Sequence, residues 1–538
     1  MIQVLREQLV GATRRIGQME HQLQQLLRRL YGRSSEKLDP RQLLLFPELL
    51  KQLQEEAGPR LAECEPVAEP SPQPTDRKGH GRRRLPRDLP RRQVVHDLPE
   101  EEKPCPCCGA MREVIGRESS EQLEYEPAKL SVIEHVRLKY GCRGCEQSAA
   151  EGGPQITTAE RPLSPIEKGL AGPGLLAYVI VSKYSDHLPL YRLERILGRH
   201  QIELARSTLC DWMRQSAEGL APLRELMVRD VLASKVIHTD DTPVDVQDRR
   251  LGKTRTGRFW VYVGDEDHPC DVFAYTPSRS RDGPMEFLAG WGQDGPRYLQ
   301  ADAFGGYDVI YAGEAGGDVV EVACWAHARR KFYEASSSDS VCSTEALARI
   351  RLLYDIEDEA REQFQRQAEG ADARPLSAIR LELRQKLAVP RLEQFKDWLE
   401  SLQAHRGGPV LPKSPMGAAI TYALNQWEAL LVYATDGDLD IDNNVAERAL
   451  RRVAVGRRNW LFCGSDNGGR TAAILFSLIA TCQRHKVEPF AYLRDVLARI
   501  AAHPVTRLAE LLPQNWKPAA ADRAPSSSPA QTDAACPG

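Results

Sequence analysis

The sequence predicts a multidomain α/β protein, in which a large core of strands and helices follows three smaller segments. The chain has 538 residues, whereas a single hydrophobic core seldom grows beyond roughly 250–300 residues. Residues 1–55 repeat apolar positions with a helical period, whereas a long series of strand-like segments begins at Lys235. Two Cys-x-x-Cys pairs stand between these parts. These observations predict several domains of different architecture.

Residues 1–55 have the pattern of a coiled-coil helix. Their apolar positions alternate in steps of three and four over about four heptads, with Arg, Gln and Glu on the outer faces. Such a seam predicts self-association, so we expect a homo-oligomer; a helix packed on its own protein is the alternative. The seam positions are Leu5, Leu9, Ala12, Ile16, Met19, Leu23, Leu26 and Leu30.

Residues 56–92 predict a flexible linker, because Pro, Glu, Ser and Arg dominate and no apolar period remains. The linker contains a basic patch around Arg82, Arg83 and Arg84, where Gly and Pro prevent a regular helix. This patch is a candidate DNA contact, although a solvated run of charge has the same composition. Residues 518–538, rich in Ala, Pro and Ser, predict a disordered tail.

Residues 93–160 predict a zinc ribbon. Two Cys-x-x-Cys pairs supply four thiolates, which is the set that a tetrahedral structural zinc ion requires. The intervening residues alternate as strands do, and strands between two knuckles account for the long separation of the pairs. Cys107 is either a bystander or a replacement ligand. The expected Zn²⁺ ligands are Cys105, Cys108, Cys142 and Cys145.

Residues 161–230 predict helices. A short amphipathic helix over 188–198 ends at Gly198, and another begins near Ala205 with Ser207 as a candidate N-cap. The pair is a candidate helix-turn-helix whose second helix enters a DNA major groove. Ordinary packed helices give the same pattern.

The period changes to strands in residues 231–475. Three hairpin-like strands, a helix and a fourth strand are typical of the opening of a ribonuclease-H-like fold, in which the first and fourth strands are neighbours. A helical insertion is expected at about 340–433, and a C-terminal helical element at 476–517. The expected strands are 235–238, 257–264, 271–276, 297–301 and 319–324, with the helix at about 284–291.

Three acids in this region point to phosphodiester chemistry. Asp240 and Asp302 each follow an apolar run, so we expect them side by side at strand ends, and Glu447 lies on a helix that Asp442, Asn443 and Asn444 can cap. Close carboxylates repel one another in a low-dielectric cleft, and cations relieve that cost. The trio therefore predicts a site for two Mg²⁺ or Mn²⁺ ions, which cut and join phosphodiester bonds.

Each acid also has an alternative interpretation. Asp241 could replace Asp240 as a ligand, Asp308 could be an ordinary helix residue, and Glu447 could pair with a neighbouring Arg. The order of Asp240, Asp302 and Glu447 on a matching scaffold favours the metal site. We interpret His327 as a packing or phosphate-contacting residue, because Arg and Lys surround it.

Positive charge follows the helix glutamate directly. The net charge of the chain is −3, so any contact with nucleic acid must come from local patches. A cluster next to a metal-binding carboxylate would meet DNA phosphates and position them without reading sequence. Its members are Arg448, Arg451, Arg457 and Arg458.

The composition is that of a globular protein outside a membrane. Hydrophobic residues make up 42% and charged residues 27% of the chain, with no apolar run long enough to span a bilayer and no signal-peptide pattern. We therefore expect a cytoplasmic protein. Its thirteen cysteines predict reduced thiols and one metal site, because disulfide frameworks belong to short secreted domains.

Several long motifs, in order, resemble those of the insertion-sequence-66 transposase family. The resemblance runs from the coiled coil to Trp516, and where the family commonly shows Asp-Glu this chain has Asp240-Asp241. The matching motifs are Leu30–Lys37, Lys78–Arg83, the knuckle at Cys105, His238–Val244, Ala301–Tyr307, Cys324–Phe332, Asp442–Arg451 and Gly456–Phe462.

The resemblance implies a DDE transposase of a bacterial mobile element, with Asp240, Asp302 and Glu447 as its triad. Such an enzyme would bind the terminal inverted repeats of its element in double-stranded DNA, cleave them and transfer the strands to a target. Elements of this family usually encode small accessory proteins, which are expected partners. The alternatives are a DNA-binding regulator with an inactive nuclease-like fold and a hydrolase that cuts but never joins.

Overall fold

The computed structural model describes residues 139–141, 156–158, 164–167, 169–200, 203–248, 250, 252–367 and 373–518. The chain divides into two units, one formed by Glu48–Ala159 and the other by Met1–Pro47 with Glu160–Gly538. In the first unit, the described residues form a short antiparallel ribbon of β1 (Lys139–Gly141) and β2 (Ile156–Thr158). The predicted coiled coil, linker, basic patch, zinc ligands and nearly all of the tail lie outside the described residues.

A mixed sheet forms the centre of the second unit. Its strand order is β5-β4-β3-β6-β7, with β8 pairing separately with β3. The first three strands pair antiparallel, whereas β6 and β7 run parallel to β3. The prediction that the first and fourth strands are neighbours is confirmed, because β3 pairs with β6. The bounds are β3 Val236–Asp248, β4 Lys253–Val263, β5 Asp271–Thr276, β6 Arg297–Gln300, β7 Val319–Val322 and β8 Phe462–Cys463.

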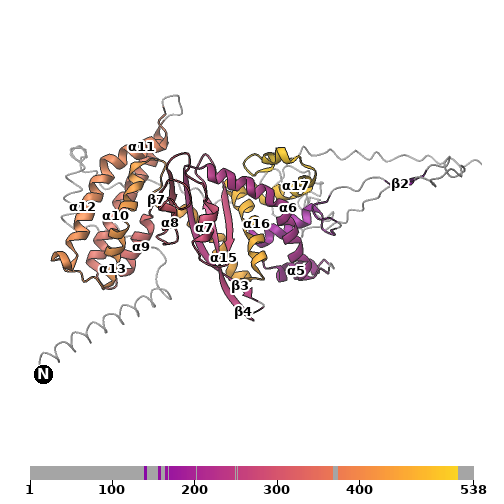
Figure 1. Cartoon of the computed structure of the whole chain (residues 1–538), viewed down its shortest axis with the longest axis horizontal. Helices are drawn as coiled ribbons and strands as arrows, with labels where there is room; N and C mark the ends of the chain where they lie inside the picture. The colour runs from indigo at the N-terminus through magenta and orange to yellow at the C-terminus, as the bar shows by residue number, and fades with distance from the viewer. Residues whose placement is uncertain are drawn as a thin grey trace, which may run out of the picture. The chain divides into compact units, whose positions relative to one another are not determined.

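Strand β3 is far longer than predicted. The expected strand ended at His238, but β3 and β4 continue as an antiparallel ribbon to the pair Asp248↔Lys253 (Figure 1). Asp240 therefore lies inside a strand, and the prediction of a strand-end position for it was wrong. The parallel pairing of β3 with β6 does end at His238↔Gln300. Asp240 thus lies just beyond the point where its parallel neighbour stops.

Helices cover both faces of the sheet. On one face Phe476 of α16 packs against Phe259 and Phe273, with ring centroids 6.0 and 5.6 Å apart. On the other face Phe287 of α7 stacks on Tyr262 at 3.6 Å. Successive residues of a strand face opposite sides, which places these aromatic clusters on opposite faces.

The helices of this part of the core differ slightly from the predicted boundaries. Helix α16 crosses the boundary predicted at residue 475, because it packs on the sheet along most of its length. Helix α7 ends before 291, where Gly290 and Gly292 take positive φ values of 77° and 91°. The bounds are α4 Pro173–Tyr184, α5 Leu190–Gly198, α6 Arg206–Ala233, α7 Asp282–Phe287, α8 Asp308–Tyr311, α15 Asn444–Trp460, α16 Asp466–Arg484, α17 Pro489–Arg499, and the 3₁₀ turns Ile500–Ala502 and Val505–Leu511.

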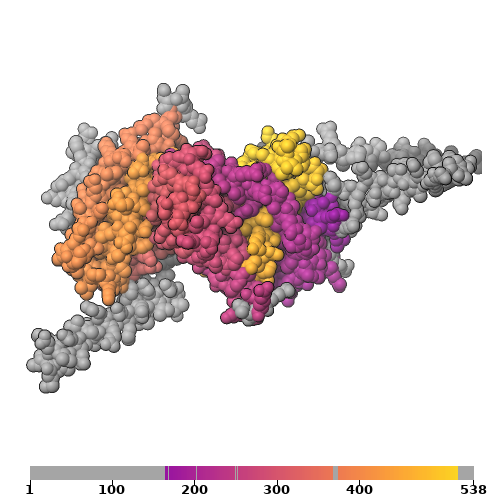
Figure 2. Space-filling model, viewed as in Figure 1, coloured from indigo at the N-terminus to yellow at the C-terminus, as the bar shows by residue number. Residues whose placement is uncertain are grey.

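The segment for which we expected a helical insertion consists mainly of helices, and together with α9 it has a hydrophobic core around Trp325, Phe332, Phe395 and Trp427. It adjoins the sheet directly, since the backbone N–H of Ala323, just after β7, donates to the Ala429 carbonyl at 3.0 Å. Figure 2 shows the orange insertion lying against the red and magenta part of the core. The bounds are α9 Trp325–Ala335, α10 Ser340–Arg366, α11 Leu376–Leu383, a π-helical turn Arg384–Ala388, α12 Val389–Ser401, α13 Pro415–Asn425, α14 Trp427–Leu431, and the 3₁₀ turns Ala404–Arg406 and Val432–Thr435.

The predicted helix pair is present as α5 and α6, but Ser207 is not the cap. Ala205 occupies the N-cap position of α6, and its side chain makes no capping hydrogen bond. On the exposed side of α6, Arg214 pairs with Asp211 at 2.7 Å and with Glu218 at 2.8 Å. The charge of this arginine is thus matched within the helix.

No helix among the described residues combines the length and the apolar character needed to cross a membrane.

Candidate active site

Strands β3 and β6 bring two of the three predicted acids together. Asp240 lies on β3, and Asp302 follows β6 by two residues, so the parallel pairing of these strands places them at one edge. Ligand oxygens of Asp240, Asp241 and Asp302 all lie within 4.8 Å of one another. These three carboxylates form the acid cluster of the site.

Helix α15 carries Glu447 in its first turn, and buried polar contacts bind the start of this helix to β3. The Asn443 side chain donates to the Thr239 carbonyl at 2.8 Å, and its Oδ1 lies 3.2 Å from His238 Nδ1. Asn443 is the N-cap residue, but its side chain makes no capping bond. Asp442 instead accepts the backbone N–H of Asn444 at 3.1 Å. The predicted capping segment therefore both starts the helix and fastens it to the strand that carries Asp240.

Glu447 lies outside the acid cluster but acts on it. Burial, together with the negative charges of Asp302, Asp241 and Glu447, raises the pKa of Asp240 to about 7. Oδ1 of Asp302 and Oε1 of Glu447 are buried and have no hydrogen-bond partner among the described residues. Buried carboxylate oxygens without a partner cost free energy, which a bound cation would offset. An all-oxygen donor set of this kind fits Mg²⁺ or Mn²⁺.

Asp241 differs from Asp240 because two arginines already neutralise it. The Asp241 side chain is 1% exposed, and Arg258 and Arg279 contact it at 2.8 and 2.7 Å. A carboxylate with both oxygens bound by guanidinium groups is a poor ligand for a further cation. This geometry favours Asp240 over Asp241 as the metal ligand. Asp308, the remaining alternative, is an exposed residue in the first turn of α8.

His327 lies next to Glu447, which sequence reasoning did not anticipate. Its Nε2 is 3.6 Å from Glu447 Oε1, and Arg330 approaches the other oxygen of Glu447 at 3.9 Å. Burial lowers the pKa of His327, so the neutral imidazole is favoured at neutral pH. The Nδ1 atom is buried without a hydrogen-bond partner among the described residues. His327 is therefore a side chain of the site and not only a packing residue.

The predicted arginine cluster divides into two groups. Arg448, Arg451 and Arg458 are exposed on α15 and can meet phosphate. Arg457 instead donates to Thr242 Oγ1 at 2.8 Å and to the Pro243 carbonyl. This contact fastens the end of α15 to β3, so Arg457 has a structural partner in place of a phosphate.

Two arginines that the sequence did not reveal complete the site. Arg258 stands opposite Pro243 in the β3–β4 ribbon, and the strand period could have placed it on the same face as Asp241. Arg279 lies in the loop after β5, where no period applies. It contacts both Asp241 and Asp302.

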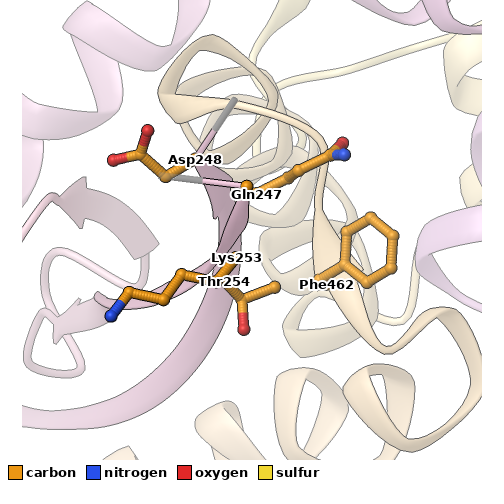
Figure 3. Close-up of a pocket in the computed structure, with 6 residues that line it drawn as sticks. Gln247, Asp248, Lys253, Thr254 and Phe462 are labelled. Atoms are coloured by element: carbon orange, nitrogen blue, oxygen red, sulfur yellow. The ribbon is translucent and has the colours of Figure 1, made fainter. Parts of the chain in front are cut away.

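A pocket of about 460 Å³ lies away from the acids, near the end of the β3–β4 ribbon. Gln247, Lys253 and Thr254 line it from the ribbon, and Phe462 lines it from β8 (Figure 3). None of the predicted catalytic residues borders it. The candidate active site is therefore the acid cluster at the sheet edge and not this pocket.

The raised pKa of Asp240 predicts a pH-dependent stability difference. The folded-state value of about 7 lies above the ordinary 3.8, so the folded protein loses stability as pH rises from about 4 to 7, and the full cost is present above 7. In chelator, Asp240→Asn should remove a penalty of roughly 4 kcal/mol at most, from about three pKa units at 1.36 kcal/mol each. Melting curves should show that the melting temperature of the variant, relative to that of the unmodified protein, increases between pH 5 and 8. Asp308→Asn serves as the control, and an equal gain there would contradict the assignment.

Four family models match the chain. The model described as "Transposase IS66 family" matches residues 168–471, and "IS66 C-terminal element" matches 477–514. Residues 102–146 match "zinc-finger binding domain of transposase IS66", and residues 18–94 match "Transposase C of IS166 homeodomain". Together they cover the acid cluster, α15 and the cysteine pairs.

Proteins of Sinorhizobium fredii are similar to this chain over most of its length. Uncharacterized protein y4hP is 34% identical over 530 residues, which are 94% of this chain and 89% of the relative. Uncharacterized protein y4qI is 33% identical, and the match covers 94% of this chain and 90% of the relative. Uncharacterized protein y4jD is 31% identical, and the match covers 80% of this chain and 81% of the relative.

Proposed function

The chain belongs to the IS66 family of transposases, and we propose that it is the metal-dependent enzyme that cleaves and joins the DNA ends of its insertion sequence. One observation carries this proposal: oxygens of Asp240 and Asp302 lie together at one sheet edge, and the charge of Glu447 acts on the same cluster. The buried oxygens of Asp302 and Glu447 that have no hydrogen-bond partner among the described residues support the same conclusion. Carboxylate oxygens of this kind are the donors that two-metal phosphodiester chemistry uses.

We propose that the sheet is a ribonuclease-H-like core. The order β5-β4-β3-β6-β7, with three antiparallel strands followed by two parallel ones, supports this assignment. So does α15, which packs against β3 and presents its glutamate after a long helical insertion. In this arrangement the insertion lengthens the connection between β7 and α15 without moving Glu447 away from the strands.

In the proposed mechanism, Asp240, Asp302 and Glu447 hold the cations. Mg²⁺ or Mn²⁺ held there would activate a water or a DNA 3′-hydroxyl for attack and would stabilise charge on the leaving oxygen. Arg448, Arg451 and Arg458, exposed on the helix that carries Glu447, hold the DNA backbone beside the acids. His327 and Arg330 keep Glu447 within reach of the cluster.

Recognition of DNA ends is proposed for the N-terminal parts. The zinc ribbon and the α5–α6 pair would bind the terminal inverted repeats, with the basic patch at Arg82–Arg84 adding phosphate contacts. The coiled coil would bring two ends together in an oligomer, and accessory proteins of the same element would assist. Because the substrate is DNA of a bacterial host, we propose that the protein works in the cytoplasm.

A cleavage and joining assay tests the proposed function. DNA that carries the inverted repeats flanking the reading frame is labelled and incubated with the protein in Mg²⁺ or in EDTA. We expect Mg²⁺-dependent nicks at the repeat ends and covalent products joined to target DNA. Binding without any cleavage would instead identify a DNA-binding regulator, and cleavage without joined products would identify a hydrolase.

Replacement of one predicted zinc ligand should weaken the binding of DNA ends without changing the acid cluster. Cys142→Ser leaves three thiolates, and a structural zinc site normally requires four ligands for its domain to fold. We expect loss of stoichiometric zinc and at least a tenfold weaker binding of repeat DNA in a gel-shift assay. Cys342→Ser, at a free cysteine on α10 in the helical insertion, is the control and should keep both. Normal end binding by zinc-free protein would contradict the ribbon's role.

A further inference from the structure

Arg279 occupies a place among the acids that the proposed mechanism does not use. It lies between β5 and α7, in the loop that passes the end of the β3–β6 pair. Its guanidinium contacts Asp241 at 2.7 Å and Asp302 at 3.2 Å. One positive side chain therefore bridges a neutralised aspartate and a proposed metal ligand.

The contact with Asp241 is the firmer of the two. Nε and Nη2 of Arg279 both approach Oδ1 of Asp241, at 2.9 and 2.7 Å. Oδ2 of Asp241 is occupied by Arg258 at 2.8 Å. The guanidinium also lies over the Phe304 ring, 4.0 Å from its centroid. Asp241 and Phe304 can thus hold Arg279 in place even if its bond to Asp302 is released.

The two oxygens of Asp302 have different surroundings. Its Oδ2 accepts from Arg279, whereas its Oδ1 is buried without a partner among the described residues. An arginine cannot lose its proton in a protein, so its charge remains beside any cation that Asp302 binds. The two positive charges compete for one carboxylate.

We propose that Arg279 is a tethered cation that holds Asp302 in the metal-free site and releases it when a divalent cation binds. The freed N–H groups, still anchored through Asp241 and Phe304, then point toward the phosphate at the cations. This second step rests on the proposed function. Arg279 would prevent repulsion among the acids before binding and would stabilise phosphate charge afterwards.

The neighbouring Arg281 provides a matched comparison. It stands two residues further on, at the N-cap of α7, and is exposed. Within the described parts of the chain it forms no ion pair with the acid cluster. Removing Arg281 changes the net charge of the loop as much as removing Arg279 does, but leaves the contacts to Asp241 and Asp302 intact.

Mn²⁺ titration of the full chain without DNA tests the proposal. We expect Arg279→Gln to bind Mn²⁺ about tenfold more tightly than the unmodified protein, a change that corresponds to about 1.4 kcal/mol, whereas Arg281→Gln should change affinity less than twofold. With repeat DNA at saturating Mn²⁺, Arg279→Gln should join strands at least tenfold more slowly. Arg279→Lys keeps the charge but cannot bridge two carboxylates, so its Mn²⁺ affinity should lie between that of the unmodified protein and that of Arg279→Gln. This variant provides a second test if Arg279→Gln does not fold.

Two outcomes separate the inference from the proposed function. If Arg279→Gln binds Mn²⁺ no more tightly than Arg281→Gln, the proposed role of Arg279 is wrong, but the proposed metal site is not contradicted. If the unmodified protein binds Mn²⁺ no better than Asp302→Asn does, the metal site itself is wrong.

Discussion

Asp302→Ala should reduce strand cleavage by roughly 10³-fold or more, the scale expected when one electrostatic contributor to a transition state is removed, and should leave the binding of repeat DNA unchanged. Within the part of the chain that the structure describes, one buried oxygen of Asp302 has no hydrogen-bond partner, and the side chain lies beside Asp240 at the sheet edge. Its loss removes one of the side chains proposed to hold cations, whereas the DNA-binding parts lie elsewhere in the chain. The measurement is cleavage of end-labelled DNA in Mg²⁺, with a gel shift on the same preparation.

Asp308→Ala is the matched control for that variant. Asp308 is an exposed acid six residues further on, in the first turn of α8, and it has no place in the acid cluster. We expect it to cleave at the unmodified rate. Cleavage retained by Asp302→Ala would contradict the assignment of the triad, and loss of cleavage in both variants would point to a disturbed loop.

The largest effect on stability is expected for Arg384→Met in the helical insertion. Arg384 is fully buried and donates to both oxygens of Glu357, at 2.7 and 2.8 Å. It also donates to the carbonyls of Tyr433, Asp436 and Leu439. Replacing Arg384 leaves the Glu357 carboxylate, which is 2% exposed, without its two strongest hydrogen bonds. Breaking a buried ion pair in this way typically costs about 3–5 kcal/mol. Urea unfolding followed by tryptophan fluorescence measures the loss.

Two further variants identify the cause of that loss. Arg374→Met breaks an exposed pair with Glu382 at 2.7 Å, and an exposed pair contributes less than about 1 kcal/mol. The double variant Glu357→Gln with Arg384→Met removes the buried charge as well, so it should recover part of the stability. A loss for Arg384→Met no larger than that for Arg374→Met would contradict this account.

The same buried arginine connects the insertion to the segment that precedes α15. Its carbonyl partners lie in the segment that leads into α15, and Lys235 holds Asp436 and Asp438 of that segment at 2.7 Å each. Gln300, at the end of β6, donates to the Asp440 carbonyl at 2.7 Å. Contacts from the insertion and from two strands thus converge on the residues before Glu447. The insertion therefore helps to position Glu447 rather than merely separating it in sequence from the other acids.

The sequence predicted the order of the strands because their apolar runs are short, regular and separated by clear turns. It did not predict the length of β3. Val244 and Val246 are buried in alternation with Asp245 and Gln247, but Pro243 lacks an N–H and argues against a strand interior. Pro243 is tolerated because β6 no longer pairs with β3 at that point.

Residue type was enough to propose the three acids, whereas the neighbours of these acids depend on geometry that the sequence does not show. Carboxylates after strands and before an arginine-rich helix pointed to Asp240, Asp302 and Glu447. The neutralisation of Asp241 depends on Arg279, whose loop has no period and whose distance from the acids follows only from the fold. Asn443 was expected to cap its own helix, but its side chain bonds β3 because the helix packs there.

The most direct test of the central claim is a crystal structure of the protein with Mn²⁺, examined by anomalous scattering. The account predicts two manganese peaks, roughly 3.5–4 Å apart as in two-metal sites, with Asp240, Asp302 and Glu447 among their ligands. No manganese at these carboxylates, or manganese bound with Glu447 turned away from it, would contradict the proposal that these three acids form one metal site.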